Sequence, residues 1–113
     1  MLTLYHQGSS VCAAKVRIVL HEKNLDWDSE YIDVLKGEQF EPTYLILNPN
    51  AVVPTLVHDG NVIIESMVNC EYLDDVFPDP PLRPTDSYAL AQMRIWTKRV
   101  DELLPRRYAQ TRA

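Results

Sequence analysis

Apolar residues alternate with polar ones over short stretches of the chain and recur at helical spacing over longer ones. The short stretches predict strands, and they lie at residues 2–5, 27–34, 55–57 and 62–64. Helical spacing predicts helices over 11–24 and from Ser66 to about Phe77, and 40–47 is a short helical or irregular connection. The predicted order is therefore β-α-β-α-β-β-α.

Polar and turn-forming residues mark the ends of these elements. Ser9 and Ser10 stand where the N-cap of the first helix belongs. Asp59-Gly60 separates the last two predicted strands, and this dipeptide favours a tight hairpin. The boundaries of both elements can therefore be assigned from side-chain chemistry as well as from periodicity.

The two predicted helices differ in how their apolar residues are arranged. The first carries them on two faces, one including Val11 and Ile18 and the other Val16 and Leu20, which predicts a helix buried over most of its girth. The second has one inner side, formed by Met67, Cys70, Leu73 and Phe77.

Four prolines, at positions 78, 80, 81 and 84, predict a linker after the second helix. Asp86 then caps a helix from about Ser87 to Leu104, which we expect Pro105 to end. The predicted organisation is a domain over 1–78, a proline-rich linker over 79–85, and a helical segment over 86–113.

The order of elements indicates an α/β fold. Two parallel strands joined by a helix, followed by an antiparallel hairpin and a final helix, are typical of a thioredoxin-like sheet. We therefore expect a thioredoxin-like βαβαββα domain with one further helix after the linker.

Composition narrows the possible partners. The net charge of −5 opposes nucleic-acid binding, and no apolar run approaches the roughly 18 residues of a membrane helix. The two cysteines form no disulfide framework, so a reducing cytoplasm is the expected location. The three histidines lack metal-ligand spacing, so we expect no metal site.

Val53-Pro54 is the first candidate binding element. Proline cannot donate to a sheet ladder, so Pro54 should stand at the start of the strand. With a cis bond, the backbone of Val53 would face outward and pair with a peptide-like ligand in the manner of an added strand. An ordinary loop proline with a trans bond is the alternative.

Glu65-Ser66 is the second candidate. The free amides of a helix start, together with the Ser66 hydroxyl, suit a carboxylate, and Glu65 suits an ammonium group. A ligand with both groups on one carbon, such as a γ-glutamyl head, would satisfy the pair. The alternative is a plain N-cap with an acidic neighbour.

Ser10 and Cys12 lie at the start of the first helix, where the helix dipole favours an anion. Lowering the pKa of a thiol from about 8.5 to about 6.5 requires roughly 2.7 kcal/mol. One hydrogen bond to a charged group contributes about 1.5–3 kcal/mol, so one serine suffices to activate a bound thiol. The alternative makes Ser10 only a cap and Cys12 a small core residue.

Lys36 and Gln39 follow the second predicted strand and could reach a ligand's carboxylate or amide, although most such loop residues are merely solvated. Trp96, on the last predicted helix, is interpreted as part of a packing stripe with Ile95, Val100 and Leu103.

The motifs and their spacing resemble those of the glutathione transferase family. They are Gly8-Ser9-Ser10-Val11-Cys12, the run NPNAVVPTL over 48–56, and Glu65-Ser66. The resemblance covers residues 1 to about 104. It implies that Val53, before a cis Pro54, pairs with the cysteinyl backbone of glutathione, and that Glu65 and Ser66 hold its γ-glutamyl group.

The same resemblance suggests a serine-type member, because the activating residue of that type lies seven positions before a helix arginine, here Arg17. That register selects Ser10. Cys12 falls where zeta-like members also place a cysteine, which leaves a mixed-disulfide or isomerase role open. Residues 65–77 and 93–98 look similar to bacterial glutathione-dependent β-aryl-etherases.

Two departures from the family pattern affect these expectations. Val52 stands where many members place Lys or Gln, and only the first helix of the family's second, all-helical domain is present. We therefore interpret the chain as truncated. We expect a homodimeric glutathione transferase-like protein that activates glutathione for attack on a small electrophile; the alternative is a non-catalytic glutathione-binding or protein-interaction module.

Overall fold

The computed structural model describes residues 1–112, with side chains described for residues 1–100 and Glu102. It contains one four-stranded sheet with strand order β2-β1-β3-β4. The strands are β1 (Leu2–His6), β2 (Asp28–Tyr31), β3 (Thr55–His58) and β4 (Asn61–Ile64). β1 pairs with β2 in parallel and with β3 antiparallel, and β3 pairs antiparallel with β4. The predicted thioredoxin-like order is confirmed.

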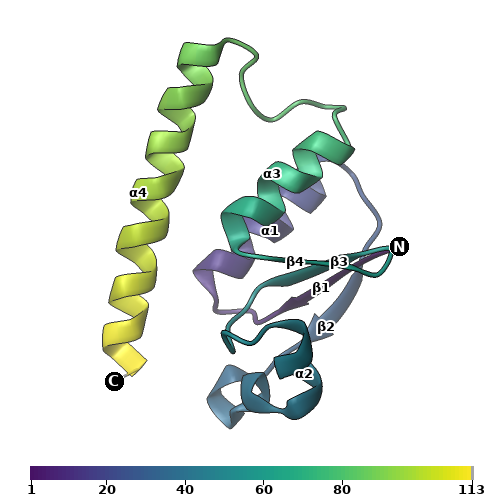
Figure 1. Ribbon diagram of the computed structural model, residues 1–113, viewed down its shortest axis with the longest axis vertical. Coiled ribbons are helices and arrows are strands. Elements are labelled where there is room, and N and C mark those ends of the chain that lie inside the picture. The colour runs from purple at the N-terminus through teal and green to yellow at the C-terminus, as the bar shows by residue number, and fades with distance from the viewer. Residues whose placement is uncertain (113) are drawn as a thin grey trace.

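Helices cover both faces of this sheet (Figure 1). They are α1 (Val11–Glu22), α2 (Pro42–Leu47), α3 (Ser66–Val76) and α4 (Ser87–Arg112). Two short 3₁₀ turns, η1 (Val34–Lys36) and η2 (Glu38–Phe40), precede α2. α1 and α3 lie together on one face and α2 lies on the other (Figure 1).

The core lies between the sheet and the helices α1 and α3. Its buried members are Leu2, Leu4, Val16, Leu20, Leu56 and Leu73. The prediction that α1 is buried over most of its girth is wrong, because Val11 is 48% exposed and Ile18 60% exposed. The sides of α1 that meet the sheet and α3 are packed, whereas Val11 and Ile18 lie largely outside these contacts.

The predicted turn and cap chemistry is confirmed. His58 pairs with Asn61 across the hairpin, while Asp59 and Gly60 take φ values of 49° and 85°. Both central residues thus have the positive φ of a two-residue hairpin turn. Ser10 caps α1, and its Oγ accepts a hydrogen bond from the N–H of Ala13 at 3.2 Å.

The second strand is shorter than predicted. Residues 27–34 were expected to form it, but β2 spans Asp28–Tyr31 and all four of its residues are exposed. β2 is an edge strand, and the apolar side chain that anchors this segment to the core is Trp27, just before it. Bulky residues here therefore mark the ends of the strand and not its whole length.

Helix α4 begins as predicted and ends later. The N–H of Ala89 donates to Asp86 Oδ2 at 2.9 Å, which confirms the cap. The helix runs through Pro105 to Arg112, so the prediction that Pro105 ends it is wrong. The fixed φ of proline is close to the helical value, so a helix can pass through it when the one lost backbone hydrogen bond is tolerated. Arg94 of α4 pairs with Glu71 of α3 at 2.9 Å.

A buried ion pair ties the end of α1 to α3 and the linker. Lys23 Nζ lies 2.7 Å from Asp74 Oδ1, and it also donates to the carbonyl oxygens of Phe77 and Pro80 at 2.6 and 2.7 Å. Burial alone would raise the pKa of Asp74, but hydrogen bonds from Lys23 and from the N–H of Leu82, with the charge of Arg83, hold it below its ordinary value. This network fixes the start of the linker.

Among the residues that the structure describes, we find no helix with the length and apolar character needed to cross a membrane.

Candidate functional site

The predicted site residues come from three loops at one end of the sheet. Tyr5 pairs with Thr55, and Thr55 pairs with Ile64. Accordingly, the end of β1, the start of β3 and the end of β4 are neighbours. The loops attached there carry Ser10, Val53-Pro54 and Glu65-Ser66 respectively, so the register brings these segments to the same edge.

The loop before β3 is held by side chains beneath it. The hydroxyl of Tyr44 donates to the carbonyl oxygen of Val52 at 2.5 Å and lies 2.7 Å from Thr55 Oγ1. Asn48, 1% exposed, donates from Nδ2 to the same two acceptors, each at 3.1 Å, and accepts from the N–H of Asn50. Burial raises the pKa of Tyr44, so it remains a donor.

Val53 and Pro54 lie at the exit of this loop, and the peptide bond between them is cis. Val53 is 8% exposed. Within residues 1–100, neither its N–H nor its C=O is hydrogen-bonded to another group. A buried backbone pair without partners is uncommon, and it leaves one donor and one acceptor for a bound peptide.

Glu65 and Ser66 form the open N-terminus of α3. Glu65 takes φ +74°, a conformation that costs a residue with a side chain about 1–3 kcal/mol, and its carboxylate makes no capping hydrogen bond. The N–H groups of the first turn have no intrahelical acceptor. Ser66 is 4% exposed, and among the described residues its hydroxyl has no hydrogen-bond partner.

Ser10 is 8% exposed, and its oxygen accepts the N-cap hydrogen bond that orders α1. A hydroxyl also carries one donor, which that bond does not use. Ser9 differs, because it is exposed and its hydroxyl donates to Gln7 Oε1 at 2.7 Å. Cys12, in the first turn of α1, is a half-buried free thiol.

Lys36 and Gln39, the two weaker candidates, differ in burial. Lys36 projects into solvent with its side chain 77% exposed, and its nearest carboxylate is Asp33 at 4.0 Å. Gln39 is 6% exposed, and its Oε1 is a buried acceptor with no partner in the described part of the chain. Of these two candidates, only Gln39 therefore has a fixed hydrogen-bonding atom without a partner.

Sequence reasoning missed the residues that support the site. The sequence places Asn48 only in the motif run over 48–56, and Tyr44 only in the short connection over 40–47. An asparagine followed two residues later by another asparagine suggests a local turn, but nothing in the sequence indicates that Asn48 also reaches Thr55. Among the described residues, no group of three His, Cys, Asp or Glu side chains is placed to hold a metal ion.

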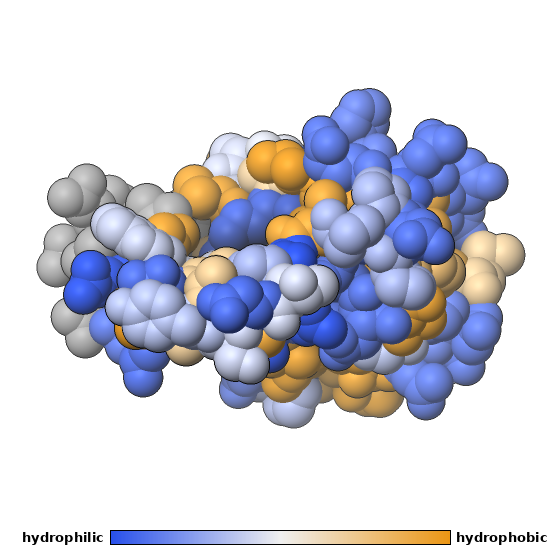
Figure 2. Space-filling model, turned by 90° about the horizontal axis from the view of Figure 1, so that it is seen from above, coloured by the Kyte–Doolittle hydropathy of each residue, from blue (hydrophilic) through white to orange (hydrophobic). Residues whose placement is uncertain are grey.

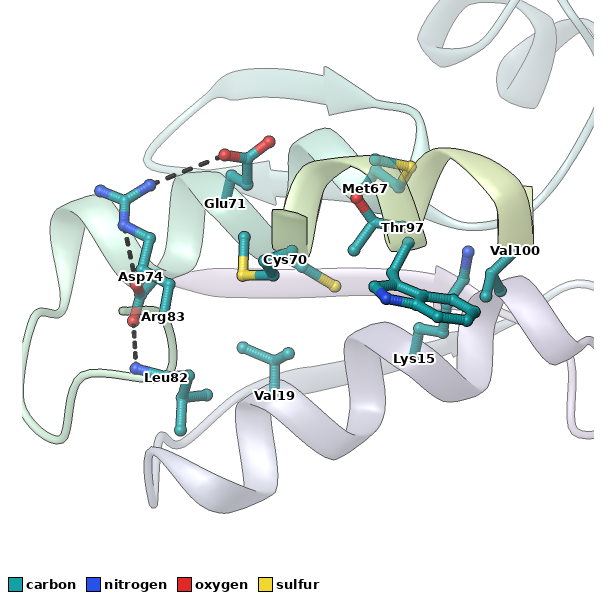
Figure 3. Close-up of a pocket in the computed structure, with 12 residues that line it drawn as sticks. Lys15, Val19, Met67, Cys70, Glu71, Asp74, Leu82, Arg83, Thr97 and Val100 are labelled. Atoms are coloured by element: carbon teal, nitrogen blue, oxygen red, sulfur yellow. Dashed lines mark hydrogen bonds and ion pairs between the residues drawn. The ribbon is translucent and has the colours of Figure 1, made fainter. Parts of the chain in front are cut away.

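A cavity of about 300 Å³ lies elsewhere, between α1, α3 and α4. Side chains of the three helices face one another across it (Figure 3). Its apolar members include Val19, Met67, Cys70, Met93, Trp96 and Val100. Burial raises the pKa of Cys70 to about 11, so this thiol stays protonated.

The predicted packing stripe on α4 is only partly packed. Trp96 and Val100 line the cavity, but Trp96 is 64% exposed and Ile95 52% exposed, and the side chain of Leu103 lies outside the described residues. Apolar surface interrupts the hydrophilic surface in several places in the space-filling view (Figure 2).

The comparisons with known proteins decide the family. The model of the glutathione S-transferase N-terminal domain matches residues 9–76. The chain belongs to this family. That match contains Ser10, Val53-Pro54 and Glu65-Ser66, and the predicted family resemblance is confirmed.

The relatives are consistent with this assignment. Protein LigF of Sphingobium sp. is 45% identical over 103 residues, covering 89% of this chain and 40% of LigF. A zeta class glutathione S-transferase of Euphorbia esula is 40% identical over 80% of this chain and 40% of that protein. The chain thus spans about 40% of the length of these relatives.

Solved structures show the same fold. The crystal structure of the beta-etherase LigF superimposes with a TM-score of 0.84 over 89% of this chain and 42% of that one. A glutathione transferase homologue from Sulfitobacter, solved with bound glutathione, has a TM-score of 0.79 at 35% identity, over 83% of this chain and 45% of that one.

Proposed function

We propose that this chain binds glutathione along the edge of the sheet formed by Val53, Glu65 and Ser66. The γ-glutamyl carboxylate accepts from the Ser66 hydroxyl and the first amides of α3, while the γ-glutamyl ammonium meets the Glu65 carboxylate. The cysteinyl backbone pairs with the free N–H and C=O of Val53, beside Pro54. A relative that was solved with glutathione supports this ligand.

We propose that the segment before α2 binds the glycyl end of glutathione. Gln39 offers its open acceptor to an amide N–H of the ligand, and Lys36 contributes a mobile positive charge to the glycyl carboxylate. Because Lys36 is far more exposed, we expect the smaller contribution from it.

Ser10 is proposed to donate its hydroxyl hydrogen to the thiolate of bound glutathione. One such hydrogen bond, worth about 1.5–3 kcal/mol, covers the roughly 2.7 kcal/mol that a shift of two pKa units requires. The activated thiolate then attacks a small electrophilic second substrate. Cys12, two residues farther along the chain in the first turn of α1, is the alternative catalytic group through a mixed disulfide with glutathione.

The observation that best supports the proposal is the unpaired hydroxyl of Ser66 at the start of α3. Ser66 is 4% exposed as a residue, its hydroxyl has no hydrogen-bond partner among the described residues, and its acidic neighbour Glu65 does not cap the helix, so the hydroxyl is available to a ligand. A γ-glutamyl carboxylate supplies the missing acceptor.

Calorimetric titration with glutathione tests the site. Ser66→Ala should weaken binding about 10- to 100-fold, as expected for loss of a hydrogen bond to a charged group. Ser87→Ala is the matched control, because Ser87 also opens a helix after an acidic residue. Binding that is tight and equal in wild type and Ser66→Ala would remove the assignment.

The relatives are longer than this chain, and the transfer reaction is proposed for a protein of their full length. We propose that residues 1–78 form the glutathione-binding domain, that 79–85 link it onward, and that 86–113 begin an all-helical domain. As in the family, two copies would associate. A reducing cytoplasm is proposed because Cys12 and Cys70 are both free.

A second candidate function is a non-catalytic interaction module, and the surface of α4 favours it. Trp96 and Ile95 are more than half exposed, and large apolar side chains left uncovered tend to associate. Turnover with a standard electrophilic arene separates the two functions. A module without a second-substrate pocket should show almost none while it still binds glutathione.

A further inference from the structure

The middle of the turn that places Ser10 is exposed and is not held by packing. The N–H of Ser10 closes the turn on the carbonyl oxygen of Gln7 at 3.1 Å. Between them, Gly8 and Ser9 are exposed, and no atom lies within 4 Å of the position that a Cβ on Gly8 would take. The buried residues Gln7 and Ser10 hold the two ends of the turn, and its exposed middle requires a polar restraint.

Arg17 supplies that restraint from inside α1. Its guanidinium donates from Nη1 to the carbonyl oxygen of Gln7 and from Nη2 to that of Gly8, each at 3.3 Å. Two consecutive carbonyls are thus held by one planar fork, whose donors have a fixed relative geometry. The carbonyl of Gln7 is shared by Arg17 and the N–H of Ser10, which links the guanidinium directly to the serine.

His6 in turn orients Arg17. Arg17 Nη1 lies 3.0 Å from His6 Nδ1, and a guanidinium can only donate, so Nδ1 is the acceptor. The ring proton then lies on Nε2, which donates to Ser29 Oγ at 2.5 Å. His6 is therefore neutral, in one tautomer, and held between α1 and β2.

The surroundings of His6 keep it in that form. Its ring packs edge-on against Trp27 and Tyr31, with centroids 5.4 and 6.4 Å away. Burial, and then the charge of Arg17, lower the pKa of His6 below its ordinary value.

We propose that Arg17, oriented by His6, is a positioning residue that holds the Ser10 hydroxyl where it reaches the thiol of bound glutathione. The inference rests on the proposed function, since it explains how the donor of that function is placed. It assigns the effect of Arg17 to the geometry of two carbonyls and not to its positive charge. Lysine, a single flexible point charge, should therefore fail to replace it.

The test follows the ionisation of bound glutathione through the ultraviolet absorbance of its thiolate as the pH is raised. For Arg17→Lys and Arg17→Met the apparent pKa of the bound thiol should rise by about one to two units, toward the free value of about 8.5. Lys98→Met removes an exposed positive charge on α4 that pairs with Glu102, and should leave the thiol pKa unchanged.

Rescue at His6 provides a second readout. His6→Asn keeps a hydrogen-bond acceptor near the position of Nδ1 and should retain much of the wild-type thiol pKa. His6→Leu removes the acceptor and should behave like Arg17→Met. A purely structural role of the ring would make these two variants alike.

S-methylglutathione separates the inference from the proposed function, because it binds without an ionisable thiol. Its affinity should stay within about twofold of wild type in all these variants, which also shows that they are folded. A wild-type thiol pKa in Arg17→Lys would overturn the positioning role. Failure of the wild-type protein to bind S-methylglutathione would instead overturn the binding site itself.

Discussion

Two helices of this chain begin with an acidic residue followed by serine, and the two starts are used differently. At α4, Asp86 caps its own helix through the N–H of Ala89, and both Asp86 and Ser87 are exposed. At α3, Glu65 makes no capping bond, takes φ +74°, and is followed by a buried Ser66 without a partner.

This difference shows how a simple helix N-cap can be distinguished from a helix start that binds a ligand. A helix start that satisfies its own amides needs no ligand. A helix start with an acidic residue in a strained conformation and a serine hydroxyl that bonds no described residue has polar groups available to bind one. From the sequence alone, a plain N-cap is a possible interpretation of both pairs. The backbone conformation and the burial distinguish them.

The largest effect is expected where polar groups are already fully paired. Lys23, buried with three acceptors, is such a group. Lys23→Met removes the buried cation from Asp74 and a donor from two carbonyl oxygens, while Arg83 Nε, 3.1 Å from Asp74 Oδ2, remains as a partner. The free energy of unfolding should therefore fall by about 3 kcal/mol, the lower end of the loss expected for a broken buried pair. Urea unfolding measures this loss.

Two controls sharpen that measurement. Lys98→Met breaks an exposed pair with Glu102 and should change the free energy of unfolding by no more than about 0.5 kcal/mol. Adding Asp74→Leu to Lys23→Met should recover part of the loss, because no buried charge is then left alone. A loss below about 1 kcal/mol in Lys23→Met would show that the pair is solvated.

The next largest effects are expected at the two helix starts, where one substitution should change glutathione affinity and the other should change stability. Glu65→Gln should weaken glutathione binding about tenfold or more, through loss of a charged hydrogen bond, with little change in stability. Asp86→Ala should do the reverse, lowering the free energy of unfolding by about 1 kcal/mol and leaving affinity unchanged. Parallel calorimetry and urea titrations measure both. Equal effects on affinity would mean that the two starts are alike.

The smallest expected effect concerns the backbone of Glu65. Glycine adopts φ +74° without steric strain, so Glu65→Gly should raise the free energy of unfolding by up to about 1 kcal/mol while it reduces glutathione binding. Asn24, at φ 52°, is the comparison position outside the site, and asparagine tolerates positive φ, so Asn24→Gly should gain less. Destabilisation by Glu65→Gly would indicate that the conformation is not strained.

Much of the fold could be predicted from local signals. Asp59-Gly60 encodes its hairpin, Ser10 and Asp86 encode their caps, and spacing alone places Leu73 inside α3. Each of these depends on residues within about one turn of one another, which is why the sequence displays them.

The remaining features depend on contacts between distant segments. The exposure of Ile18 follows from which side of α1 meets the sheet, and the pairing of Lys23 with Asp74 joins residues 23 and 74. Arg17 could be used as a marker of register, yet its hydrogen bonds to the turn are visible only in the fold. The candidate site residues could be proposed from motifs, but the residues that hold the site loops, Tyr44, Asn48 and Arg17, could not.

Amide chemical shifts of the isotopically labelled chain during titration with glutathione test the central claim most directly. We predict the largest changes at the N–H groups of Val53, Ser66 and Met67, while those of Ser87 and Tyr88 at the start of α4 stay unchanged. Shifts confined to the cavity around Cys70 and Thr97, or no shift at Ser66 at saturating glutathione, would contradict the account.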